Sequence, residues 1–258
     1  MTSIIFSKDR ALQLDAFLRS YRVNVADAGE VRVLYLATSQ RHARAYADVF
    51  ARHSWVIPEP QSLSFKQDLL SLLPRDGNVV FFVDDVVFIR PWSGHGEPGL
   101  SLRLGLHLTH NYATGGTPQP LPGPRTEHPG STVTWRWADG REAWGYPLAL
   151  DGHVFDAQEM LEMAASCVFH SPNTYESALQ QFLPQFINRT GTCYRETRIV
   201  NVPWNRVQTD WHMLCGTGNG ADKMLAHWEA GKQIDLRGIY GALNTSVHQE
   251  FPLVLEDR

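Results

Sequence analysis

The chain has 258 residues, of which 43% are hydrophobic and 19% are charged, and its formal net charge at pH 7 is -4. This length and composition are typical of a globular protein that buries a sizeable core without disulfide bonds. The charge balance provides neither the basic footprint of a nucleic-acid-binding protein nor a polybasic membrane tether. We therefore expect no nucleic-acid partner.

The cysteines and the apolar segments favour a reduced, soluble setting. Cys167, Cys193 and Cys215 are far apart in sequence and odd in number, which indicates packing residues rather than a disulfide framework or a metal site. No apolar run approaches the ~18 residues of a membrane-spanning helix, and residues 3–6 resemble a strand rather than a signal peptide. We expect a cytoplasmic protein with no integral membrane segment.

Strand and helix patterns alternate over the first part of the chain. Strands are predicted at 3–6, 31–37, 55–57 and 79–83, and helices at 12–21, 41–52 and 65–73. The run at 79–83 is apolar throughout, as in strands that are covered on both faces. Right-handed crossovers would place these strands in one mostly parallel sheet with helices on both faces.

The pattern becomes irregular after Pro91. Loops rich in Gly and Pro occupy 93–99 and 112–130, and a strand is expected at 100–108. A hairpin-like pair is expected at 132–137 and 144–150, helices at 157–165, 174–186, 221–230 and 236–243, and a strand at 199–202. The glycine-rich run 216–220 follows no convincing strand, so it predicts a hinge or lid rather than a dinucleotide fingerprint. We expect a single domain, 1–258, with halves at 1–92 and 93–258.

Asp84 and Asp85 directly follow the apolar strand at 79–83. Ligands of open α/β sheets gather at the carboxyl ends of such strands. Adjacent carboxylates in apolar surroundings repel each other unless a positive charge lies between them, and a divalent metal carrying a phosphorylated ligand would supply it. The alternative is a turn or helix-capping carboxylate with a solvated neighbour.

The run Ser7, Lys8, Asp9, Arg10 after the first strand, the βαβ alternation and the acidic pair together resemble the GT-A fold of nucleotide-sugar glycosyltransferases, family 2-like. In that family a DxD-type motif holds Mn²⁺ or Mg²⁺, and the metal holds the donor diphosphate. This chain has Asp-Asp-Val instead of Asp-x-Asp. The resemblance implies a Rossmann-like, mostly parallel sheet with a nucleotide-binding half at 1–92 and a sugar and acceptor half at 93–258.

The resemblance also implies roles for individual residues. Asp85 would bind the metal, and Asp84 would contact the ribose or a metal-bound water. The residues after the first strand would contact the nucleotide; a charged surface turn is the alternative. The remaining candidates are His248 as a second metal ligand, Asp151 and His153 as catalytic groups, and Lys66 and Arg206 as donor-binding cations. For each of these residues, an ordinary position on the surface, in a turn or at a helix start remains the alternative. The aromatic cluster at 135–146 is expected to form either a sugar-stacking wall or core packing.

These expectations favour a metal-dependent enzyme that moves a sugar from a nucleoside diphosphate donor to a soluble small-molecule or saccharide acceptor. A metal-dependent mutase that converts a pyranose to a furanose on the same scaffold remains an alternative. A binding module without catalysis is a third possibility.

Overall fold

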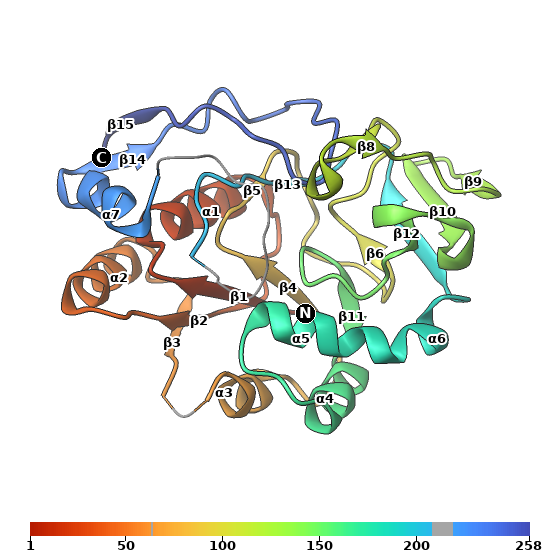
Figure 1. Cartoon of the computed structure of the whole chain (residues 1–258), viewed down its shortest axis with the longest axis horizontal. Helices are drawn as coiled ribbons and strands as arrows, with labels where there is room; N and C mark the ends of the chain where they lie inside the picture. Colours follow the sequence, from red (N-terminus) through yellow and green to blue (C-terminus); the bar gives the residue numbers. More distant parts are fainter. Residues whose placement is uncertain (63, 208–218) are drawn as a thin grey trace.

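The computed structural model describes residues 1–62, 64–207 and 219–258. Its centre is a five-stranded sheet with the order β11-β4-β1-β2-β3, and the four strands from β4 to β3 are parallel while β11 joins the edge antiparallel (Figure 1). The strands are β1 (Thr2–Lys8), β2 (Glu30–Leu36), β3 (Ile57–Pro60), β4 (Asn78–Val83) and β11 (Val154–Asp156). The mostly parallel α/β class predicted for the first part of the chain is confirmed.

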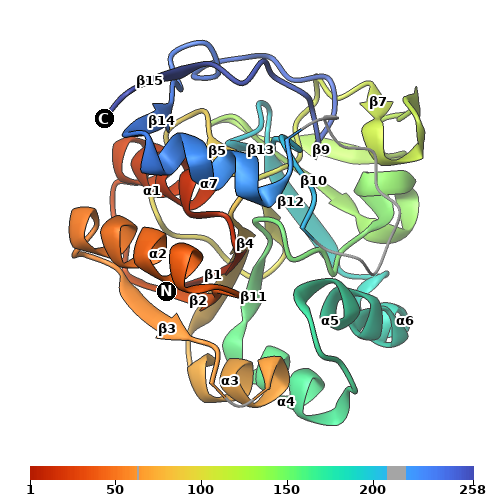
Figure 2. The same ribbon diagram turned by 60° about the vertical axis from the view of Figure 1, so that its left-hand side comes forward.

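Helices cover both faces of this sheet, as Figure 2 shows. One face carries α1 (Ala11–Asn24), α2 (Gln40–Arg52) and α7 (Ala221–Glu229), and the other carries α3 (Phe65–Leu72), α4 (Ala157–Ser166) and α5 (Pro172–Leu179). Serine side chains cap three of the helices: Ser39 begins α2, Ser64 begins α3 and Ser171 begins α5, each accepting a hydrogen bond from a backbone amide of the first turn.

Alternating side chains of β4 fill the two cores between the sheet and the helices. Val80 and Phe82 pack on the α1 face, whereas Val79 and Phe81 pack on the α3 face, and all four are fully buried. A strand that is apolar on both faces needs this arrangement, because successive side chains point to opposite sides of a sheet. The α1-face core also contains Trp228, so both halves of the chain contribute to it.

Smaller sheets lie outside the central sheet. A four-stranded sheet has the order β6-β12-β10-β9, and three pairs join β13 to β5, β14 to β15 and β7 to β8. Their bounds are β5 (Val86–Phe88), β6 (Leu100–Ser101), β7 (His110–Asn111), β8 (Thr117–Pro118), β9 (Arg125–Glu127), β10 (Thr132–Arg136), β12 (Thr190–Tyr194), β13 (Ile199–Asn201), β14 (Lys232–Ile234) and β15 (Leu255–Asp257).

Several predicted elements in this half are wrong. The expected hairpin does not form, because β10 pairs with β12 and β9, while 3₁₀ turns occupy Trp137–Asp139 and Glu142–Gly145. The strand expected at 100–108 is limited to β6; beyond it the amide of Leu102 bonds to Gly152 and that of Leu106 to Arg195 without a continuous ladder.

Three other boundaries also differ from the prediction. The helix expected at 174–186 is divided into α5, a 3₁₀ turn at Gln180–Phe182 and α6 (Leu183–Phe186), where Pro184 cannot donate a backbone hydrogen bond. Residues 236–243 form turns, with Gly241 at φ +72°, instead of a helix. The strand expected at 55–57 lies slightly later, as β3.

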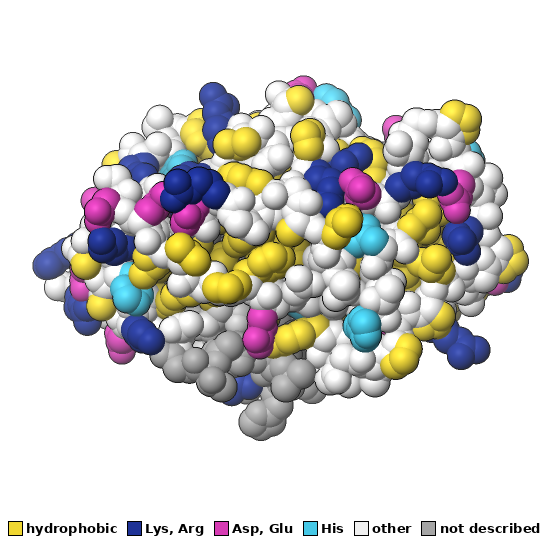
Figure 3. Space-filling view, turned by 90° about the horizontal axis from the view of Figure 1, so that it is seen from above, with side chains coloured by type: hydrophobic (Ala, Val, Ile, Leu, Met, Phe, Trp, Pro, Cys, Tyr) yellow, Lys and Arg dark blue, Asp and Glu magenta, His cyan; other side chains and the backbone are white. Residues whose placement is uncertain are grey.

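Two surface findings bear on the expected partners. No helix within the described ranges is long and apolar enough to cross a membrane. On the face shown in Figure 3, basic side chains are interspersed with acidic and hydrophobic ones instead of forming one basic patch.

Candidate functional site

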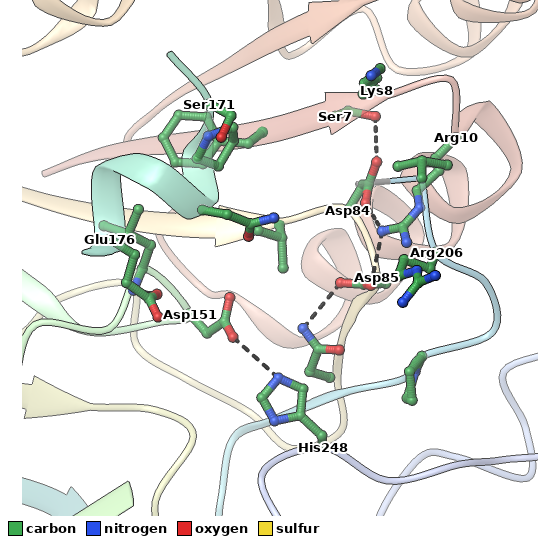
Figure 4. Close-up of a pocket in the computed structure, with 18 of the residues that line it drawn as sticks. Ser7, Lys8, Arg10, Asp84, Asp85, Asp151, Ser171, Glu176, Arg206 and His248 are labelled. Carbon is green, nitrogen blue, oxygen red and sulfur yellow. Dashed lines mark hydrogen bonds and ion pairs between the residues drawn. The ribbon is translucent and has the colours of Figure 1, made fainter. Parts of the chain in front are cut away.

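A cavity of about 740 Å³ lies at the carboxyl ends of β1 and β4. The two strands are adjacent and parallel, with Phe6 opposite Val83, so the residues that follow them reach the same edge of the sheet. Figure 4 shows Arg10, Asp84, Asp85 and Arg206 on one side of the cavity, and Asp151 and Glu176 on the other. Ligand sites of open α/β sheets occupy this position.

Arg10 lies between the two adjacent carboxylates. Its Nη1 donates to Asp84 Oδ1 and to Asp85 Oδ2, both at 2.9 Å, and its Nη2 donates to the backbone oxygen of Asn205 at 2.6 Å. The positive charge that the acidic pair requires is thus present within the chain. We call Arg10, Asp84 and Asp85 the acid-pair wall.

The two carboxylates of this wall differ in accessibility. Asp84 also accepts a hydrogen bond from Ser7 Oγ at 2.7 Å, and its side chain is 3% exposed. Asp85 accepts one from Asn201 Nδ2 at 3.0 Å, and its side chain is 13% exposed. Protein donors contact both oxygens of each carboxylate, and the larger exposed fraction of Asp85 makes it the more accessible of the two to a ligand.

Burial and the neighbouring charges shift the ionisation of this wall. Burial raises the pKa of Asp84 to about 6, and Asp85 adds to the rise, while Arg10 and Ser7 act in the opposite direction. For Arg10, burial disfavours the charged form, but the two carboxylates outweigh it and raise the pKa of the guanidinium. Arg10 therefore remains charged, and the wall carries about one net negative charge when both acids are ionised.

A second group of titratable residues forms the opposite side of the cavity, and we call it the Asp151 wall. Its central ion pair joins Arg103 Nη1 to Asp151 Oδ2 at 3.4 Å, and Nε2 of His248 lies 3.7 Å from the same oxygen. Glu176 of α5 accepts hydrogen bonds from the Tyr146 hydroxyl at 3.1 Å and from the Leu150 amide at 2.8 Å.

Backbone pairing brings His248 to this wall from the C-terminal segment. Strand β5, which directly follows the acidic pair in sequence, pairs with β13. On the other side of β13, Asn201 forms a parallel β-bridge with His248. Burial lowers the pKa of His248 to about 4, and Arg103 lowers it further while Asp85 opposes the shift. His248 is consequently neutral at pH 7.

The carboxyls of the Asp151 wall are harder to ionise than free ones. Burial raises the pKa of Asp151, and Arg103 opposes the rise. Burial, followed by the charge of Asp151, raises the pKa of Glu176, while the Leu150 amide, Arg103 and Tyr146 act against it. A raised pKa makes a carboxylate a stronger base once it is ionised, which suits a group that accepts a proton from a bound ligand.

Most of the predicted site residues line the cavity. They are Ser7, Lys8, Arg10, Asp84, Asp85, Asp151, Arg206 and His248. Phe6, Leu34, Leu36 and Phe65 line it as well, and these apolar side chains could contact a flat base.

Three predicted site residues do not line the cavity. Asp9 accepts hydrogen bonds from the Thr38 amide at 2.8 Å and hydroxyl at 2.7 Å, so it holds the loop after β2. Lys66 donates to the backbone oxygens of residues 165 and 167 at the end of α4. His153 is 1% exposed, and its Nδ1 lies 3.0 Å from the Pro147 oxygen.

The aromatic cluster has a packing role. Trp135, Trp137 and Trp144 are at most 3% exposed. The ring of Trp135 packs edge to face on both others, with centroid distances of 4.8 Å to Trp137 and 4.9 Å to Trp144. Tyr146 is the member of the cluster that lines the cavity. The glycine-rich run 216–220, predicted to be a hinge or lid, lies partly outside the described residues, because 208–218 are not described. Cys215 lies wholly outside them.

Asp85 and His248 are the two predicted metal ligands. A carboxylate and a neutral imidazole are suitable ligands for Mn²⁺, and both side chains line the cavity. Among the residues that the structure describes, no group of three or more His, Cys, Asp or Glu side chains is arranged to hold a metal. Mg²⁺ in phosphate-transfer sites is often held by one or two carboxylates together with the substrate phosphates, so a preformed cage is not required.

Sequence reasoning proposed Asn205 alongside Arg206 as a donor contact, and Asn205 lines the cavity, but it missed Arg103, Glu176 and Asn201. Arg103 and Glu176 are separated from Asp151 by long stretches of chain and belong to different elements. The available signal was an acidic residue in the helix that follows Ser171 and Pro172, but Glu176 lies beyond the first turn of that helix and nothing in its local pattern distinguishes it from a surface residue.

Comparison of the chain with models of known protein families and with curated protein sequences found no match.

Proposed function

We propose that the protein is a glycosyltransferase that uses a nucleoside diphosphate sugar. One observation carries the proposal: a single cavity of about 740 Å³ joins the acid-pair wall to the Asp151 wall. Pockets that bind small molecules have volumes of roughly 300–1,000 Å³, and this cavity lies within that range. The GT-A resemblance of the sequence is consistent with this arrangement.

The donor diphosphate would lie beside the acid-pair wall, with Lys8 and Arg206 as the cations that contact it on the same side of the cavity. Guanidinium groups bind phosphate oxygens through two parallel hydrogen bonds. Asp85 and His248 would hold a divalent cation. Such a cation neutralises the charge of the departing diphosphate.

The acceptor would lie at the Asp151 wall. The acceptor oxygen forms a bond to the anomeric carbon as the bond from that carbon to the diphosphate oxygen breaks, and the hydroxyl proton passes to Asp151. Its position beside Arg103, at 3.4 Å, favours the ionised form of Asp151 that can accept a proton. The nucleoside diphosphate leaves with the bonding electrons.

Two measurements test the proposal. Calorimetric titration with UDP, GDP, dTDP and CDP, each with and without Mn²⁺, should identify one nucleotide that binds. Incubation with sugars of that nucleotide, with and without candidate saccharide acceptors, should then give a glycosylated acceptor. If no nucleoside diphosphate binds under any condition, the proposal is wrong.

The same incubations separate the alternatives. Conversion of the donor into an isomer without acceptor would establish a mutase in place of a transferase. Nucleotide-sugar binding with neither transfer nor isomerisation across the acceptor panel would support a binding module.

A further inference from the structure

The 146–152 segment carries Asp151 into the cavity, and both of its ends are fastened. At one end, the Gly152 amide donates to the Phe81 oxygen of β4 at 2.8 Å, and the Leu102 amide donates to the Gly152 oxygen at 2.9 Å. Gly152 has φ +71°, and a Cβ there would come within 2.4 Å of Ile199, so this turn requires glycine. The sheet thus fixes the C-terminal end of the segment.

Glu176 of α5 holds the segment at two places, its N-terminal residue Tyr146 and the residue before Asp151, while His153 and Gln180 contact the backbone oxygens of Pro147 and Leu148 between them. One of its carboxylate oxygens accepts from the Tyr146 hydroxyl at 3.1 Å, and the other accepts from the Leu150 amide at 2.8 Å. Leu150 directly precedes Asp151 and is 2% exposed. A buried amide that loses its acceptor costs free energy, so removing the Glu176 carboxylate would force the segment to shift.

The hydrogen bonds of Glu176 favour an indirect role over direct contact with the acceptor. Both oxygens of Glu176 already accept hydrogen bonds from the protein, whereas the protein groups facing Asp151 are the more distant Arg103 at 3.4 Å and His248 at 3.7 Å. Asp151 is therefore the freer carboxylate of the two, and Glu176 is the one that holds its backbone.

We propose that Glu176 is the positioning residue for Asp151: its bidentate contact with Tyr146 and the Leu150 amide sets the place of the Asp151 carboxylate at the acceptor end of the cavity. This inference rests on the proposed function, because it assigns Glu176 to the proton-accepting step. A displacement of about 1 Å at a reacting group can lower turnover roughly a hundredfold.

The test compares Glu176→Ala, Glu176→Gln and Asp151→Asn with the double variant Glu176→Ala/Asp151→Asn, using the donor and acceptor found as above. Glu176→Ala should lower kcat by about ten- to a hundredfold. The nucleoside diphosphate Kd measured with Mn²⁺ should change less than about threefold, because Glu176 lies away from the acid-pair wall. Glu176→Gln keeps an oxygen for the Leu150 amide and should restore kcat to within about threefold of wild type.

The double variant separates positioning from a general loss of structure. If Glu176 acts through Asp151, Glu176→Ala should cause no further loss in the Asp151→Asn background. Glu162→Ala, at an exposed position on α4, serves as the matched control and should leave kcat unchanged.

Three outcomes would overturn the inference. They are an equal loss from Glu176→Ala with or without Asp151, a Glu176→Gln variant as impaired as Glu176→Ala, and a weakened nucleotide Kd with unchanged kcat. Failure of the wild-type protein to bind any nucleoside diphosphate would instead overturn the proposed function, and the inference with it.

Discussion

Arg10 Nη1 donates to Asp84 Oδ1 at 2.9 Å across the ends of two neighbouring parallel strands, and both side chains are at most 9% exposed. The pair joins the loop after β1 to the loop after β4 at the cavity. Removing one partner of a buried ion pair leaves an uncompensated charge, which is far more costly than the pair is favourable.

Replacement of Arg10 should therefore affect both stability and binding. Arg10→Gln is expected to lower the free energy of unfolding by roughly 3 kcal/mol, because Asp84 and Asp85 would then be buried together without a counter-charge. It should also weaken nucleoside diphosphate binding. Urea denaturation and calorimetry measure the two effects. Arg41→Gln, which removes an exposed pair with Glu229, is the control and should change stability much less; equal losses would contradict the prediction.

Asp84 and Asp85 should differ when each is changed to asparagine. Asp85→Asn is expected to reduce the gain in nucleotide affinity that Mn²⁺ provides by about ten- to a hundredfold, because it removes a charged ligand. Asp84→Asn should mainly lower stability, because Asp84 holds Arg10 and Ser7. Calorimetry at several Mn²⁺ concentrations distinguishes them. Nucleotide binding indifferent to Mn²⁺ in the wild-type protein would show that the metal expectation is wrong.

Asp151→Asn should separate transfer from donor binding. The amide occupies nearly the same volume but cannot accept the hydroxyl proton, so turnover should fall by about 10²- to 10⁴-fold. The Kd of the nucleoside diphosphate should remain close to that of the wild type, since Asp151 lies on the opposite wall. Full turnover in this variant would remove Asp151 from the catalytic role.

Lys66→Ala tests a residue that was predicted to bind the nucleotide-sugar donor but does not line the cavity in the structure. Lys66 donates to backbone oxygens at the end of α4, so the substitution should reduce stability slightly and leave nucleotide affinity unchanged. A thermal melt and the same titration measure these two quantities. Weakened nucleotide binding without a change in stability would contradict this prediction and show that Lys66 contributes to nucleotide binding.

His153 should make the folded state sensitive to acid. Burial lowers the pKa of His153 to about 3, with Arg103 adding to the fall and the contact with the Pro147 oxygen opposing it. Because the folded pKa is below the unfolded value of about 6.5, the contribution to stability is complete above pH 6.5 and decreases as the pH falls towards 3. Each pH unit in this window removes up to about 1.4 kcal/mol.

The variant His153→Phe should reduce this pH dependence. Between pH 7 and pH 5 the loss of unfolding free energy is expected to be smaller than in the wild type by about 2 kcal/mol, since roughly 1.5 pH units of proton linkage are removed. Urea denaturation at both pH values measures it. His95→Phe changes an exposed histidine and serves as the control; an unchanged pH dependence in His153→Phe would place the acid sensitivity at other groups.

The local pattern of the first half was sufficient to predict its architecture. The fully apolar run in β4 needs cover on both faces, and the amphipathic segments of α1 and α2 supply that cover on one of them, so the parallel sheet follows from periodicity. The same reasoning failed for β10, whose partner β12 lies far along the chain. Pairing between distant strands depends on the packing of the whole domain, and a hairpin pattern cannot reveal it.

The sequence by itself determined that two carboxylates end a buried strand, and therefore that a positive charge must accompany them. Only the tertiary structure decided that Arg10 supplies this charge, because the partner is chosen by the adjacency of β1 and β4. Tertiary structure likewise brought Glu176, Arg103 and His248 around Asp151 from three separate parts of the chain. Charges interact through space over a few ångströms, whereas sequence patterns record only near neighbours along the chain.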